Sequence, residues 1–140
     1  MRAKFRLLSA AAIGLLTATT TFAETVFECE ATYRSRDGWT PDRIFFIFDD
    51  DMQSVKVLDG IINAMHEKPI PAEIKKRSGQ RYDLSWTVRD IRASDGGEVT
   101  VQYSAMVNSE KGRFSVNGYV GGYDNNARSE GNCKRAPGSS

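Results

Sequence analysis

Two cysteines are the residues of this 140-residue chain best suited to chemistry. Cys29 and Cys133 could form a redox pair, but such pairs usually have Cys-x-x-Cys spacing or a site that lowers the pKa of one thiol. Neither feature is visible, and the two cysteines lie near opposite ends of the sequence. A structural disulfide is the expected use for two cysteines in an exported domain. For a loop of this length, the chain-entropy model gives up to ~4.7 kcal/mol.

The other polar groups form no recognisable catalytic or metal-binding pattern. His66 is the only histidine, and no Gly-x-Ser-x-Gly elbow accompanies it to support a serine hydrolase. The acidic run Asp49–Asp51 lacks the alternate ligands and distal glutamate of a calcium loop, and it indicates a solvated turn. Glu28 and Glu30 share one face of an alternating stretch, whereas a glycosidase needs two carboxylates across a cleft. We therefore expect no catalytic residue, no metal and no cofactor.

The first 23 residues have the features of a secretory signal peptide. Three basic residues precede an apolar run from Leu7 to Leu16, and Ala23 offers a small residue at the expected cleavage site. The run is too short to span a bilayer. We expect the mature chain, residues 24–140, to fold as one domain in the periplasm or outside the cell, where disulfides persist.

Charge and hydropathy exclude two classes of partner. Three of the 19 basic residues lie in the leader, which leaves 16 basic against 18 acidic residues in the 117-residue mature chain. A nearly neutral domain has no electrostatic footprint for nucleic acid. No second apolar stretch is long enough to span a membrane. The mature protein is expected to be a soluble monomer.

Alternation of apolar and polar residues dominates the mature sequence and predicts an all-β fold. Residues 82–88 and 99–107 are the clearest examples. Eight or nine short strands joined by short turns favour an antiparallel meander, and about eight such strands can close into a small barrel without free edges. Closure would place the first strand beside the last, so a Cys29–Cys133 disulfide would join them. A two-sheet β-sandwich is the alternative.

Two segments have less regular patterns. Asp59-Gly60 lies between apolar runs and predicts a two-residue type I′ hairpin, which would place Val57 opposite Ile62. Residues 72–76 follow two prolines and are compatible with either a strand or a single helical turn.

Bulky side chains on the alternating faces favour a filled barrel interior. The predicted inward-facing residues are Phe27, Tyr33, Trp86, Tyr103 and Phe114. Trp86 alternates with apolar neighbours and is expected in the core. Trp39 lies instead in a polar loop, where it could contact a partner or plug one end of the barrel.

Loops supply the candidate binding surface. Tyrosine, tryptophan and arginine carry much of the energy of protein interfaces, and loops often carry function. The candidate binding residues are Arg36, Trp39, Tyr119 and Tyr123. The two tyrosines belong to a glycine- and tyrosine-rich stretch, residues 118–126, that could equally form a structural corner.

The sequence therefore predicts a non-enzymatic binding module. Its expected layout is similar to that of small periplasmic β-barrels such as lysozyme inhibitors, and also to that of lipocalin-like carriers. The first hypothesis is that its loops contact another envelope or extracellular protein, as an inhibitor does. The alternative is that the barrel carries a small apolar ligand, since eight-strand barrels have either a filled interior or one small cavity.

Overall fold

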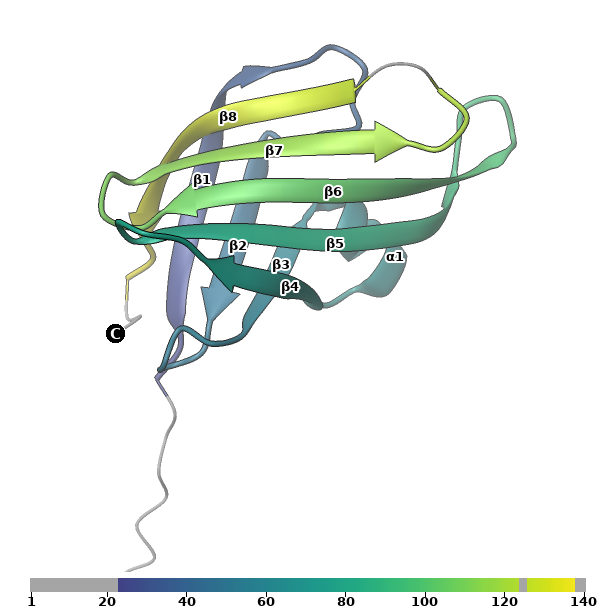
Figure 1. Ribbon diagram of the computed structural model, residues 1–140. Coiled ribbons are helices and arrows are strands. Elements are labelled where there is room, and N and C mark those ends of the chain that lie inside the picture. Colours follow the sequence, from purple (N-terminus) through teal and green to yellow (C-terminus); the bar gives the residue numbers. More distant parts are fainter. Residues whose placement is uncertain (1–22, 124–125, 138–140) are drawn as a thin grey trace, which may run out of the picture.

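Eight antiparallel strands follow one another around a closed barrel in the computed structural model, which describes residues 23–123 and 126–137 (Figure 1). A helix, α1 (Gly60–His66), connects the third strand to the fourth. The predicted meander barrel is confirmed, and the alternative, a two-sheet β-sandwich, is not the fold. The predicted leader, up to residue 22, lies outside the described residues. The strands are β1 (Thr25–Arg34), β2 (Arg43–Phe48), β3 (Val55–Asp59), β4 (Ile70–Lys76), β5 (Arg81–Arg92), β6 (Glu98–Asn108), β7 (Arg113–Val120) and β8 (Asn126–Arg135).

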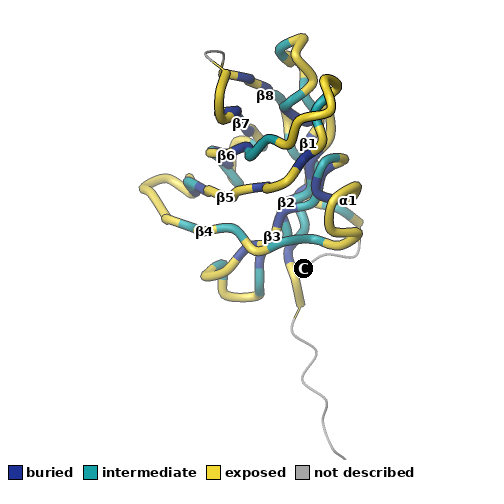
Figure 2. The backbone as a smooth tube through the Cα atoms, turned by 90° about the vertical axis from the view of Figure 1, so that its right-hand side faces the viewer, coloured by how far each residue is buried: buried dark blue, intermediate teal, exposed yellow. Residues whose placement is uncertain are grey.

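Strand alternation places large apolar side chains inside the barrel, and buried and exposed positions alternate along the tube in Figure 2. Rings from different strands meet in the interior. The ring of Phe46 lies 6.4 Å from that of Trp86 and 6.4 Å from that of Phe114, measured between centroids. Trp86 stacks on Tyr103 at 5.3 Å. Four of the five predicted inward residues are buried, Phe27 among them.

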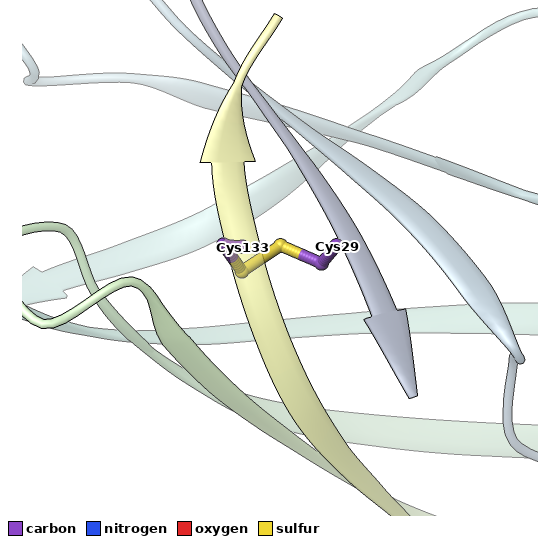
Figure 3. Close-up of a disulfide and its surroundings, with 2 residues drawn as sticks. All are labelled: Cys29 and Cys133. Carbon is purple, nitrogen blue, oxygen red and sulfur yellow. A yellow bond between two sulfur atoms is a disulfide. The ribbon is translucent and has the colours of Figure 1, made fainter. Parts of the chain in front are cut away.

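The disulfide joins the first and last strands, as Figure 3 shows. Cys29 lies directly opposite Cys133 in the antiparallel register of β1 and β8, and their Cα atoms are 4.0 Å apart. The predicted pairing is confirmed. The side chain of Cys29 is fully buried, so one half of the bridge belongs to the core.

The same pair of strands corrects one prediction. Alternation predicts an inward-facing Tyr33, but this side chain is 55% exposed. The register between β1 and β8 shifts between Ala31 and Tyr33, and such a bulge changes the face on which the following side chains lie. Gly131 permits the close approach of the two strands here, because a Cβ at this position would overlap the carbonyl oxygen of Glu30.

The hairpin predicted at Asp59-Gly60 is wrong. Asp59 ends β3 with an extended backbone, φ −141°, and is the N-cap of α1. Its Oδ1 accepts the backbone N–H of Ile62 at 2.8 Å, which satisfies one of the free donors at the helix start. Ile62 is therefore buried in the core rather than paired with Val57. The helix ends at Glu67, whose left-handed backbone (φ 56°) donates its N–H back to the helix.

Residues 72–76 belong to β4, so the strand alternative is confirmed for this segment. The meander order also gathers α1 and the connections β1–β2, β5–β6 and β7–β8 at one end of the barrel, which we call the loop end. The described ends of the chain lie at the opposite end, where β1 begins and β8 finishes (Figure 1).

Candidate binding surface

A depression of about 820 Å³ crosses the outer face of strands β4 to β8. Strand pairing arranges its outward side chains in two rows. In the first row, Ser85 lies opposite Ser104, which lies opposite Asn117. The second row, nearer the loop end, runs from β5 to β8 in the order Thr87, Gln102, Tyr119 and Asn126. Each row therefore crosses several strands at one level of the barrel.

Neutral hydrogen-bonding groups dominate these rows. Glu73 is the charged side chain among the lining residues, and Ser85 Oγ donates to its Oε2 at 3.5 Å. Tyr119 is 53% exposed and provides the largest aromatic area of the lining. Serine, asparagine and tyrosine together are typical of antibody paratopes, where tyrosine offers rigid contact area and the small polar side chains adapt their hydrogen bonds.

Charged side chains border the depression on its β8 side. Arg128 extends the first row beyond Asn117 and donates to Asn117 Oδ1 at 3.2 Å. The same guanidinium forms an ion pair with Glu130 at 2.8 Å. A second depression of about 350 Å³ begins here and includes Arg113, Arg128 and Glu130. An ion pair thus borders the neutral floor of the first depression on its β8 side.

Three of the four predicted binding residues are exposed near the loop end. Arg36 lies in the β1–β2 loop, and this loop is attached to β8 by the hydrogen bond from Ser35 N to the Arg128 carbonyl, 2.8 Å. Tyr123 lies just after β7 and is 45% exposed. Of the four predicted residues, only Tyr119 lines the depression.

Trp39 has a different position from the one expected of a contact residue. Its side chain is half-buried and packs against the core. Its carbonyl oxygen accepts a hydrogen bond from the Tyr103 hydroxyl at 2.7 Å, and its amide donates to Asp37 Oδ1 at 3.1 Å. These contacts favour the second role considered for Trp39, which is to cover one end of the barrel.

Two titratable groups under the loop end are perturbed by burial. Burial raises the pKa of Asp59, whose Oδ2 has no hydrogen-bond partner among the described residues. Burial, followed by the nearby charges of Asp59 and Asp37, also raises the pKa of Tyr103. The Tyr103 proton is held by the Trp39 carbonyl. Both groups therefore serve the packing of this end.

The Asp49 carboxylate accepts hydrogen bonds from residues of its own turn. Asp49 Oδ1 accepts the backbone N–H groups of Gln53 at 2.8 Å and Ser54 at 3.1 Å, and Oδ2 accepts the Ser54 hydroxyl at 2.8 Å. The Ser54 bonds are the main cause that lowers the pKa of Asp49 to about 2. Among residues 23–123 and 126–137, no cluster of three or more potential metal-ligating side chains occurs. His66 is exposed in the last turn of α1.

The comparisons with known proteins found no match among protein families, curated proteins or solved structures. Within the described part of the chain, no helix is long and apolar enough to cross a bilayer. The functional argument therefore depends on the geometry of this chain.

Most of the depression does not follow from the sequence pattern. Alternation within residues 82–88 and 99–107 places Ser85, Thr87, Gln102 and Ser104 only on the polar sides of two strands. A signal was present, because three consecutive strands carry uncharged polar residues at the matching outward positions. Only the register shows that these positions lie side by side.

Proposed function

We propose that this protein is an exported, non-enzymatic binding module that recognises another protein through the outer depression of β4–β8 and its border at the loop end. The observation that carries the proposal is the pair of neutral polar rows with Tyr119 exposed among them. Antibody paratopes have a similar composition, in which adaptable hydrogen-bonding groups surround rigid aromatic side chains, and tyrosine is a frequent hot-spot residue of protein interfaces.

The packing of the interior favours this role over that of a carrier for a small apolar ligand. Phe46, Trp86 and Phe114 meet near the middle of the barrel, with ring centroids 6.4 Å apart in each contact. Phe48 and Tyr82 meet at 5.2 Å. A barrel of eight strands has room for either such side chains or one small ligand, and here side chains take the space.

Tyr119 and Tyr33 form a matched pair for testing the proposal. Both are strand tyrosines with similar exposure, 53% and 55%, but Tyr33 does not line the depression. Replacement of either residue by a photo-crosslinking phenylalanine analogue should give a defined covalent complex in the native compartment only from position 119. Tyr119→Ala should then weaken binding of the identified protein about tenfold or more, as expected for an interface aromatic.

Unchanged thermal unfolding of Tyr119→Ala is the necessary control, and Tyr33→Ala should retain nearly full binding. Equal crosslinking from both positions would argue against the depression as the recognition surface. Co-purification of a small apolar molecule, with no crosslinked protein, would favour the carrier hypothesis instead.

Export to an oxidising compartment is part of the proposal. It is supported by the basic and apolar segments before Ala23 and by the disulfide between Cys29 and Cys133. Sequencing of the mature N-terminus from the native host should give Glu24. An intact Met1 would contradict export by cleavage of this leader.

A further inference from the structure

The pairing of β4 with β5 stops part of the way along β5. The paired positions run from Lys76–Tyr82 to Glu73–Ser85. Beyond Ser85, β5 continues to Arg92 beside β6, while β4 turns to pair with β3. Figure 2 shows the two tubes diverging from their common turn. Among the described residues, the second half of β5 therefore has no paired strand on its β4 side.

Two prolines explain where the pairing stops. The hydrogen bond from Arg77 N to Arg81 O, 2.7 Å, fixes which residues of the β4–β5 hairpin exchange backbone hydrogen bonds, and these residues alternate. Glu73 and Ser85 belong to this set. On β4 the next two members would be Pro71 and Pro69. Proline has no backbone N–H, so β4 lacks the donors that would continue the ladder.

The same alternation identifies the exposed backbone groups of β5. After Ser85, the next residue whose N–H and C=O point toward the β4 side is Thr87. Thr87 and Pro71 both line the depression, so a hollow lies beside this part of the edge. A β-bulge between Val88 and Ile91 then ends the regular strand. The unpaired edge is short and lies on one side of the recognition surface.

The side chains beside this edge carry both signs of charge. Helix α1 packs mainly against β3. Arg89 and Asp90 are adjacent, both are exposed, and neither makes an ion pair among the described residues. An occupant of the edge would therefore meet backbone groups at strand spacing beside one positive and one negative side chain.

We propose that the free edge of β5 at Thr87 binds an extended segment of a partner protein by strand addition. Such binding supplies main-chain hydrogen bonds to an unpaired strand, and side-chain contacts add specificity. The inference rests on the proposed binding role, since Thr87 also lines the depression.

A synthetic peptide can test the edge directly. The probe is a seven-residue peptide of alternating valine and threonine, added to the intact disulfide-bonded protein. In hydrogen-exchange NMR of the free protein, the Thr87 amide should exchange faster than those of Trp86 and Val88, which face β6. The probe should shift the Thr87 resonance and slow its exchange.

Two altered probes separate strand addition from other binding. Each altered probe carries N-methyl groups on every second backbone amide, so it loses the hydrogen bonds of one of its two edges. The peptide methylated on the edge that faces β5 should bind about tenfold more weakly than the peptide methylated on its other edge. Equal binding of the two N-methylated peptides would overturn the proposal.

Protein variants provide the matched control. Thr87→Pro removes the edge N–H and should abolish peptide binding, while Thr87→Val retains the N–H and should preserve it. If Thr87→Pro unfolds the protein, Pro71→Thr gives the second test, because renewed β4–β5 pairing should protect Thr87 and exclude the peptide. Slow Thr87 exchange caused by dimerisation of the free protein would also overturn the assignment.

The outcomes for the edge and for the depression are distinguishable. If the peptide fails while Tyr119→Ala still weakens binding of the crosslinked partner, the inference fails and the proposed function stands. If neither experiment shows an effect, both fail.

Discussion

At the scale of single residues, some buried side chains in the described part of the chain carry polar atoms without hydrogen-bond partners. Asp59 Oδ2 and Trp86 Nε1 have no hydrogen-bond partner among the described residues, although both lie in the core. A buried polar atom left unpaired costs about 1–3 kcal/mol. Asp59 compensates in part by capping α1 through its other oxygen. These residues contribute through packing and capping.

The capping carboxylate predicts a pH effect on stability. Because the pKa of Asp59 is raised in the folded state, the folded protein keeps this proton at a pH where the unfolded chain has lost it. Stability should therefore fall as pH rises from the usual value of 3.8 toward the folded value. Asp59→Asn removes the titration and keeps an oxygen for the Ile62 N–H. Urea unfolding between pH 4 and 7 should show wild type losing stability relative to this variant, and parallel curves would contradict the assignment.

The two tryptophans should differ in their contribution to stability. Trp86 is 5% exposed and contacts Phe46 and Tyr103, so Trp86→Ala should cost about 3–5 kcal/mol. Trp39→Ala should cost much less, because its side chain is half-buried at the barrel end. Trp86→Phe should fall between them, since the indole N–H it removes is unpaired. Chemical denaturation measures all three, and an equal or reversed order of the two alanine variants would show that this assignment is wrong.

At the scale of elements, the alternation of apolar and polar residues predicts the strands well, but it does not predict the bulge or the helix that interrupt the regular pattern. Period-two patterns identify β5 and β6 because each side chain's face follows from its position in the strand. Alternation could not reveal the bulge that exposes Tyr33, which depends on the strand opposite. Helix α1 was missed because Asp-Gly is typical of hairpins, yet aspartate is also a preferred N-cap. The alignment of Ser85 with Ser104 likewise depends on register.

The close contact between β1 and β8 predicts that any larger residue at position 131 destabilises the folded protein. Even a methyl group there would overlap the Glu30 carbonyl oxygen and press on the neighbouring backbone of β1. Gly131→Ala should therefore destabilise the protein by about 1–3 kcal/mol, the usual range for overpacking. Gly60→Ala is the control, since a Cβ there meets nothing within 4 Å and alanine favours helix. Equal melting temperatures for the two variants would contradict this account of the seam.

At the scale of the whole molecule, closure of the barrel depends on residues far apart in the sequence. Cys29 and Cys133 are separated by 104 positions, yet they are neighbours in the β1–β8 register. Strand pairing over such a distance must offset a large loop-closure entropy. The disulfide reduces this entropy in the unfolded chain, so its effect should be largest on global unfolding.

Reduction of the disulfide should lower the free energy of unfolding by ~2–4 kcal/mol. Denaturant unfolding with and without reductant measures the change. A double variant, Cys29→Ser with Cys133→Ser, should have the stability of the reduced protein and no response to reductant. Free thiols in the unfolded, unreduced protein would refute the pairing.

The bridge also makes the chain between Cys29 and Cys133 a covalent ring that contains almost the entire barrel. A single protease cut in any connecting loop opens this ring without releasing a fragment, because both pieces stay attached through the two sulfur atoms. Such a cut would be invisible on a non-reducing gel and would appear as two bands after reduction. Because Phe27 lies opposite Arg135, a short linker could also join the ends and allow new termini in a surface loop. A single cut in a connecting loop should therefore leave the two parts of the barrel covalently joined.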